Sequence, residues 1–176
     1  MGIGTYEVMY IQARDNYPYN VEECIEKLQY VIAADSEHVG AHFLMGRIYE
    51  EQLEDFKQAE FYYRMTLYLD KDYVPVYSQY ALLLLKLNRF DEALKIIAHG
   101  EKAPGTDLST MEYCKGQLYE KYEMFDTAIA HYIAAKKYCL NNYFIETLDS
   151  HIKRVKDKKA LDKKSKKKGE KKEKSS

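Results

Sequence analysis

Three stretches of the chain decide its fold: FKQAEFYYRMT at residues 56–66, FDEALKIIAHG at residues 90–100 and FDTAIAHYIAA at residues 125–135. Each begins with phenylalanine, has alanine three positions later, a large residue four positions after the alanine, and a small residue three positions further on. The alanines recur after 34 and then 35 residues. Apolar residues spaced at i, i+3, i+4 and i+7 are typical of an amphipathic helix. The sequence therefore predicts three equivalent helices.

A second pattern precedes each of these stretches by nine or ten residues, and consists of a small residue followed three positions later by a large one. The pairs are Gly46 with Tyr49, Ala81 with Leu84, and Gly116 with Tyr119. Small residues allow two helices to approach closely, so each unit is expected to be a hairpin of two short helices. An upstream stretch fits the second helix of a further unit through Val21, Cys24, Leu28 and Val31.

The repeated pattern resembles the tetratricopeptide repeat, a unit of 34 residues. The resemblance implies an all-α, right-handed α-solenoid of helical hairpins. Three clear repeats lie at residues 39–73, 74–108 and 109–142, and the first of them has one extra residue in its internal turn. Residues 1–38 are expected to form a degenerate N-terminal repeat that acts as a cap, because a terminal repeat lacks one neighbour. Residues 143–156 are expected to form a C-terminal capping helix.

The charge of the chain is divided between an acidic body and a basic C-terminal segment. Residues 153–176 carry 13 Lys or Arg against four Asp or Glu, a net charge of +9, and residues 1–152 carry 14 basic and 24 acidic side chains, a net charge of −10. Residues 157–176 contain one large apolar residue, Leu161, so we expect a disordered tail.

This Lys-rich tail has three interpretations. It is a solubilising segment, or one that folds back onto the acidic body, or a segment that contacts nucleic acid, ribosomes or an anionic membrane. The candidate contact residues are Lys163, Lys164, Lys166, Lys167, Lys168, Lys171 and Lys172.

The sequence contains no motif for catalysis, cofactor binding or metal binding. A glycine-rich phosphate loop and a nucleophile elbow are both missing. Cys24, Cys114 and Cys139 are widely spaced and odd in number, which argues against a metal pair and a disulfide framework. We therefore expect a protein that is not an enzyme and has no metal or cofactor.

Two further features bear on the compartment. No apolar run reaches the 18 or so residues of a transmembrane helix. The N-terminus has no basic region followed by an apolar stretch, so a secretory signal is not expected. Together with the cysteine pattern, these features predict a cytoplasmic location.

The resemblance also implies that the first helices of successive hairpins line the concave face of the solenoid. The positions expected on that face are Phe43, Leu44, Arg47 and Glu50 in the first full repeat, Ser78, Gln79, Leu82 and Lys86 in the second, and Tyr113, Cys114, Gln117 and Lys121 in the third. This mixture of aromatic, amide and charged side chains suits an extended or helical peptide.

Some tetratricopeptide proteins hold the C-terminal carboxylate of a heat-shock chaperone with a clamp of Lys, Asn and Arg side chains. The matching positions here hold Phe43, Arg47, Gln79, Thr110 and Cys114. Because only Arg47 among them can pair with a carboxylate, the sequence argues against that ligand.

The resemblance thus implies a non-catalytic adaptor or scaffold that holds a partner protein or peptide in the concave groove. Two other classes of function fit the same residues. A nucleic-acid- or ribosome-associated factor would act through the basic tail, and its affinity would fall steeply with salt. A self-associating structural protein would form homo-oligomers, and its mass would depend on concentration.

Overall fold

The structure, a computed structural model, describes the backbone of residues 4–173 and the side chains of residues 4–163. That part of the chain contains nine α-helices and no strand. They are α1 (Thr5–Asn16), α2 (Val21–Ala34), α3 (Val39–Glu51), α4 (Phe56–Leu69), α5 (Pro75–Lys86), α6 (Phe90–Gly100), α7 (Leu108–Lys121), α8 (Phe125–Tyr138) and α9 (Asn142–Glu173).

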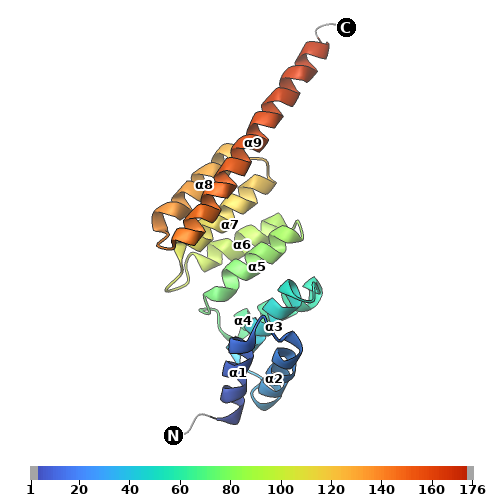
Figure 1. Ribbon diagram of the computed structural model, residues 1–176, viewed down its shortest axis with the longest axis vertical. Helices are drawn as coiled ribbons and strands as arrows, with labels where there is room; N and C mark the ends of the chain where they lie inside the picture. The colour runs from blue at the N-terminus through green and yellow to red at the C-terminus, as the bar shows by residue number, and fades with distance from the viewer. Residues whose placement is uncertain (1–3, 174–176) are drawn as a thin grey trace.

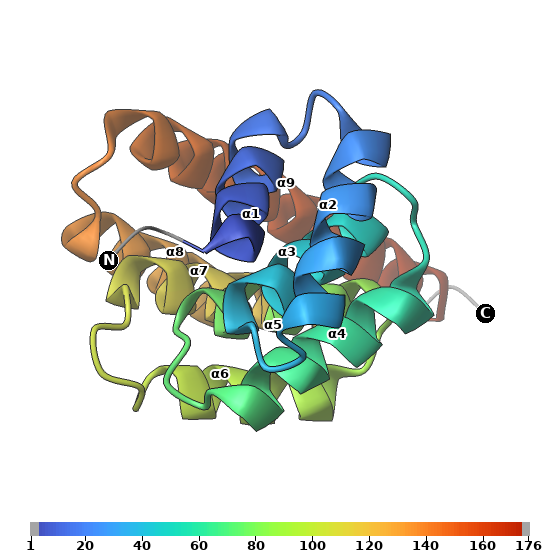
Figure 2. The same ribbon diagram turned by 90° about the horizontal axis from the view of Figure 1, so that it is seen from below.

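The first eight helices pair as four hairpins, α1/α2, α3/α4, α5/α6 and α7/α8, which are stacked along the long axis of the molecule (Figure 1). Helix α9 packs on α8 and continues past the last hairpin. Viewed along the long axis, successive hairpins are offset around it (Figure 2). The expected all-α helical-repeat fold is therefore confirmed.

The turn inside each of the three clear repeats is closed in the same way. The backbone N–H of the residue before the phenylalanine donates to a carbonyl at the end of the preceding helix, with a donor–acceptor distance of 2.9 Å in all three turns. The residue before that donor has a positive φ, 51° at Glu54 and 59° at both Asn88 and Glu123. A residue with left-handed backbone conformation, followed by an N–H that donates to a carbonyl in the last turn of the helix, is typical of a Schellman-type helix end. It fixes the angle at which the second helix leaves the first.

Glycine allows the two helices of a hairpin to approach closely in the first and third repeats. A Cβ atom on Gly46 would lie 2.6 Å from the ring of Tyr63, and one on Gly116 would lie 2.5 Å from the ring of Tyr132. Both tyrosines are fully buried. The second repeat has Ala81 in place of the glycine and Ile97 in place of the tyrosine. Isoleucine is smaller than tyrosine, so the alanine methyl group fits between the helices.

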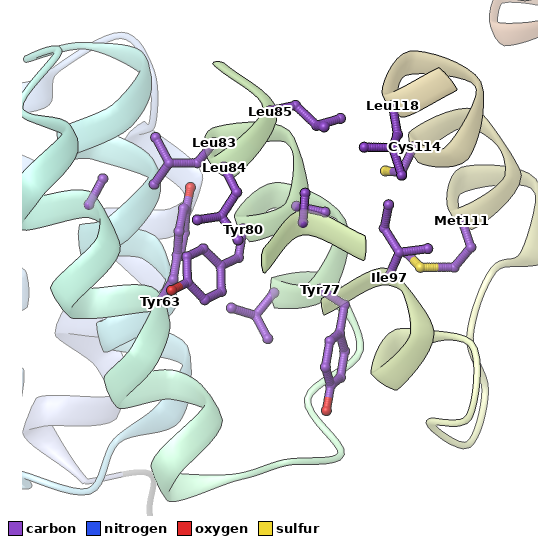
Figure 3. Packing of buried hydrophobic residues seen from close by; sticks show 14 residues of the cluster. Tyr63, Tyr77, Tyr80, Leu83, Leu84, Leu85, Ile97, Met111, Cys114 and Leu118 are labelled. Carbon is purple, nitrogen blue, oxygen red and sulfur yellow. The ribbon is translucent and has the colours of Figure 1, made fainter. Parts of the chain in front are cut away.

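The buried side chains form a series of clusters between neighbouring hairpins. The central cluster lies between α4, α5, α6 and α7 (Figure 3). Its labelled members are Tyr63, Tyr77, Tyr80, Leu83, Leu84, Leu85, Ile97, Met111, Cys114 and Leu118. Three consecutive buried leucines mark α5 as apolar on several sides, as expected for a helix packed between two hairpins.

Helix α9 is longer than the sequence indicates. We expect a capping helix over residues 143–156 and a disordered tail over 157–176, whereas the helix runs from Asn142 to Glu173. Residues 157–173 are thus helical in the structure, and the end of the expected tail, 174–176, lies outside the described residues.

Two features explain why the helix continues. Leu148 and Val155 are fully buried in the cluster that α9 shares with α8. Beyond them, Lys158 and Lys159 form ion pairs with acidic residues of the third repeat. Lysine has a good helix propensity, and extending an anchored helix needs no new nucleus.

Candidate functional site

A hollow of about 650 Å³ opens between α5, α7 and the start of α9, and we call it the α5–α7 pocket. It is lined by Ser78, Gln79, Leu82, Asp107, Ser109, Thr110, Tyr113, Tyr138, Cys139, Leu140, Asn141 and Phe144. Four of these residues, Ser78, Gln79, Leu82 and Tyr113, are groove positions expected from the sequence. The pocket therefore joins expected positions of two consecutive repeats.

The apolar part of the pocket consists of half-buried side chains with an exposed rim. The rings of Tyr113 and Phe144 meet edge to face, with 5.4 Å between their centroids, and the partly buried Leu82 also lines the hollow. At the rim, in the loop between α8 and α9, Leu140 is 100% exposed. Tyr138, also at the rim, is 54% exposed. Exposed apolar side chains that gather at a hollow are typical of an interaction surface.

Most polar groups of the pocket are bonded within the protein. The Ser109 hydroxyl donates to the carbonyl oxygen of Ala135 at 2.9 Å. The Asp107 carboxylate accepts from the Ser109 N–H at 2.9 Å and from the Thr110 hydroxyl at 2.6 Å, and so caps α7. Within the part of the chain that the structure describes, the Gln79 amide makes no hydrogen bond. It retains a donor and an acceptor for a ligand.

Three of the expected groove residues face neighbouring helices instead of a ligand. Leu44, Glu50 and Cys114 are buried, with exposures of 9% or less. Burial raises the pKa of the Cys114 thiol to about 12, so this side chain is a packed apolar group and not a reactive thiolate. The sequence places these residues on the correct helices but on the wrong faces.

Arg47 is engaged by the N-terminal part of the protein. Its Nε donates to Oε1 of Glu51 at 2.9 Å, and its guanidinium lies 4.9 Å from the centroid of the Tyr17 ring. The Tyr17 hydroxyl donates to the same glutamate. The only residue that fits a carboxylate clamp is thus already paired, which agrees with the argument against a chaperone-tail ligand.

Phe43 and Lys86 also contact side chains of their own chain. The Phe43 ring lies 5.3 Å from that of Tyr73, centroid to centroid. The ammonium group of Lys86 lies 4.3 Å from the centroid of the Phe56 ring, in a cation–π contact. Neither residue lines the α5–α7 pocket.

The last two expected groove residues, Gln117 and Lys121, line a second hollow of about 320 Å³. Its other residues are Glu120, Arg154 and Lys158. The buried Glu120 carboxylate accepts hydrogen bonds from Arg154 at 2.6 and 3.1 Å and from Lys158 at 2.7 Å. The polar centre of this hollow is therefore filled by the protein's own charges.

Glu120 holds α9 in place. Burial alone would raise the pKa of its carboxyl, but the bonds from Arg154, from Lys158 and from the Tyr132 hydroxyl at 3.0 Å outweigh burial and bring the pKa to about 2. Sequence reasoning misses this cluster, because its two cations follow Glu120 by 34 and 38 positions and lie outside the repeat pattern.

Glu50 is the counterpart of Glu120 in the first full repeat. Its carboxylate accepts from the Tyr63 hydroxyl at 2.7 Å, but no described cation bonds to it. Burial raises its pKa, although Lys86 and Arg47 lie near enough to oppose that rise in part. The proximity of this carboxylate also raises the pKa of Tyr63, after burial as the main cause.

A third hollow, of about 740 Å³, lies on α4 and reaches the start of α6. The sequence does not single out its residues, which are Lys57, Glu60, Phe61, Arg64, Met65, Tyr68 and Arg89. Glu60 and Arg89 form an ion pair at 2.5 Å there. Phe61 and Tyr68 are exposed, so this surface provides a matched comparison for the α5–α7 pocket.

The other expectations concern the tail, metals and membranes. Of the candidate tail lysines, Lys163 is exposed on α9, and the side chains of the other six lie outside the described ones. No three His, Cys, Asp or Glu side chains in the described region gather as ligands for a metal ion. None of the described helices is long and apolar enough to span a bilayer.

No protein-family model matches the sequence, and no curated protein matches it either. Several solved structures are similar in fold. MamA of Desulfovibrio magneticus RS-1 has a TM-score of 0.71 and 17% identity over 94% of this chain and 92% of that one. The tetratricopeptide protein TTC0263 of Thermus thermophilus has a TM-score of 0.69 and 17% identity, covering 85% and 80% of the two chains.

PilW, described as a type IV pilus biogenesis factor, has a TM-score of 0.68 and 17% identity over 76% of this chain. This chain spans 62% of the PilW chain, which is less than two thirds of its length. At such low identity the similarity establishes the fold alone: a tetratricopeptide-type α-solenoid.

Proposed function

We propose that this tetratricopeptide-type solenoid is a non-catalytic interaction scaffold that binds a segment of a partner protein in the α5–α7 pocket. The observation that carries the proposal is the meeting of Ser78, Gln79, Leu82 and Tyr113, from two consecutive repeats, in one open hollow. Proteins with this fold typically act as adaptors, which supports a scaffold role in general. The fold does not indicate which surface binds the partner, and the pocket is our reason for choosing this one.

The chemistry of the pocket supports a peptide segment with an apolar side chain as the ligand. A volume of about 650 Å³ lies in the range of small-ligand sites and accommodates one or two side chains. Leu82, Tyr113 and Phe144 would contact an apolar anchor residue of the partner. The unbonded Gln79 amide would pair with the partner's backbone, as in other modes of peptide recognition.

The three cysteines are free thiols. Free thiols are the usual state in a reducing compartment, and this supports the cytoplasmic location expected from the sequence.

A peptide selection tests the proposed site even while the natural partner is unidentified. Random peptides are selected on the wild-type protein, and dissociation constants of the enriched peptides are measured for wild type, Gln79→Ala and Leu82→Ala. Leu82→Ala should weaken binding about tenfold, or 1.4 kcal/mol, because it removes apolar contact at the anchor. Gln79→Ala should weaken it less, since a solvent-accessible hydrogen bond contributes about 1 kcal/mol.

The matched control is Phe61→Ala, which removes an exposed apolar side chain from the hollow on α4. It should leave the same dissociation constants unchanged. Enriched peptides that bind Leu82→Ala as tightly as wild type, while Phe61→Ala loses them, would place the binding surface on α4 instead. Circular dichroism melts of all variants show whether the fold is retained.

A further inference from the structure

The net charge changes sign along the molecule. Residues 1–73 carry six basic and 14 acidic side chains, a net charge of −8. Residues 74–152 carry eight basic and ten acidic side chains, a net charge of −2. The remaining segment, 153–176, has a net charge of +9. Nearly all of the acidic excess of the body thus belongs to the cap and the first full repeat.

These two charged regions lie at opposite ends of the solenoid (Figure 1). Helices α1 to α4 form one end of the long axis, and α9 leaves the body at the other end. At 1.5 Å per residue the 32 residues of α9 span about 48 Å without a break. The basic part of α9 therefore points away from the acidic hairpins of its own chain, which argues against a tail folded back onto them.

The acidic end presents carboxylates that pair with no cation among the described side chains. Among the described residues, the exposed acidic side chains of this end with neither an ion pair nor a hydrogen bond are Glu22, Glu26, Glu37, Glu54 and Asp72. Glu22 and Glu26 lie one turn apart on α2 and so share a face of that helix. By contrast, Glu23 and Glu51 are each paired with a cation at i, i+4.

The basic end has a matching excess of cations. Arg154, Lys158 and Lys159 bind acidic residues of the third repeat and so anchor the helix. Lys153 and Lys156 are exposed and have no ion pair within the described part of the chain.

We propose that the basic α9 of one molecule binds the acidic end, α1 to α4, of a second copy of this chain. A net charge of +9 meets one of −8, and both regions lie at the ends of the solenoid where a second copy has access. A nucleic acid would match α9 and leave the acidic end without a partner, whereas a second copy uses both ends. The contact joins different surfaces of the two copies, so it is heterologous and forms head-to-tail assemblies, either open chains or closed rings.

Sedimentation velocity on the nuclease-treated full-length protein tests the proposal. At low salt, about 0.02 M, the weight-average mass should rise above 20.7 kDa with protein concentration. At about 0.5 M salt the mass should return to 20.7 kDa, because the screening length becomes shorter than the separation of most of the charges. A mass of 20.7 kDa at every concentration in low salt would overturn the proposal. So would an association found only in a parallel sample without nuclease treatment, since nucleic acid would then bridge the copies.

Charge reversal at each end identifies the contact. The tail variant is Lys166→Glu/Lys167→Glu/Lys168→Glu, and the cap variant is Glu22→Lys/Glu26→Lys. Each alone should associate at least tenfold more weakly than wild type, and an equimolar mixture of the two should associate again, because each variant then complements the other. The control Lys95→Glu/Lys102→Glu/Lys137→Glu reverses three exposed lysines of the body and should associate like wild type. A mixture of the tail and cap variants that stays monomeric would contradict the head-to-tail contact.

Discussion

The first and third clear repeats contain the same buried pair in two electrostatic settings. In both, a glutamate four positions after the helix-packing glycine accepts a hydrogen bond from the buried tyrosine of the second helix, at 2.7 Å for Glu50 and 3.0 Å for Glu120. The Glu120 carboxylate also accepts hydrogen bonds from Arg154 and Lys158 of α9. No cation among the described residues forms such a hydrogen bond with Glu50. The pKa is raised at Glu50 and lowered to about 2 at Glu120.

The comparison shows that the repeat pattern alone does not determine whether a buried carboxylate stabilises the fold. Whether the carboxylate stabilises the fold depends on whether the helix packed after the hairpin provides cations that bond to it. The middle repeat has no such pair, because Leu85 and Ile97 occupy the two positions and are both buried. The solenoid thus accommodates an apolar pair, a carboxylate without cations, and a carboxylate with two cations at equivalent places.

The largest expected effect separates the two glutamates directly. Glu120→Ala should lower the free energy of unfolding by about 3 kcal/mol, since it breaks the contacts to α9 and leaves the Tyr132 hydroxyl buried without a partner. Glu50→Ala should cost about 1 kcal/mol, because the loss of the Tyr63 bond is partly offset by removal of a poorly compensated charge. Urea unfolding followed by circular dichroism measures both, and Glu146→Ala, on the exposed part of α9, is the control. Equal losses for Glu50 and Glu120 would contradict the comparison.

The next effect is a dependence on pH. The pKa of Glu120 is depressed from an ordinary value near 4.3 to about 2, so its stabilisation is present above pH 4.3 and is lost as the pH falls towards 2. The full shift corresponds to about 3 kcal/mol, and the half exposure of Arg154 and Lys158 reduces our expectation to about 1–2 kcal/mol. Unfolding curves between pH 5 and pH 2 should therefore fall more steeply for wild type than for Glu120→Gln; parallel curves would show that the ion pairs contribute nothing.

A smaller effect of opposite sign is expected at Glu50. Its folded pKa is raised, so the charged carboxylate destabilises the fold above the ordinary pKa near 4.3, and the cost reaches its full value above the folded pKa. Glu50→Gln keeps an acceptor for the Tyr63 hydroxyl and removes the charge. It should stabilise the protein by about 0.5–1 kcal/mol at pH 7 and by little at pH 4. A gain in thermal midpoint at pH 7 that vanishes at pH 4 is the expected observation, and a loss at pH 7 would show that nearby cations already compensate the charge.

An effect of similar size to that of Glu50→Gln concerns the outer part of the Glu120 cluster. Arg154→Gln should cost about 0.5–1 kcal/mol, because the guanidinium is half exposed and Lys158 remains to pair with the carboxylate. Hydrogen exchange should report faster opening of α9 and unchanged protection in α3 and α4. Faster exchange in α3 as well would mean that α9 stabilises the whole solenoid.

The sequence is sufficient to predict the hairpins, because local geometry reproduces the repeat pattern. The spacing between Gly46 and its phenylalanine corresponds to one helix end, one turn and one helix start, closed by the same backbone hydrogen bond in each repeat. The sequence predicts that the small residues let two helices approach, and the structure adds that Gly46 does so against Tyr63 and Gly116 against Tyr132.

The candidate site is only partly predictable from the sequence. Successive side chains of a helix differ by about 100° in direction. An error of one residue in assigning the groove positions therefore selects a side chain that points into the core. Cys114, next to the pocket residue Tyr113, illustrates this. The rim residue Leu140 and the cations that bind Glu120 lie beyond the last repeat, where no periodicity predicts which repeat they contact.

The stacking of hairpins in chain order also has a kinetic consequence. Apart from the ion pairs of α9, each cluster joins helices that are close in sequence, so few contacts require the closure of a long loop. Such a topology favours rapid folding. During synthesis α1 and α2 can pair before the later hairpins leave the ribosome, and α9 emerges after the hairpins on which it packs. Unfolding is then expected to begin at an end and to proceed hairpin by hairpin.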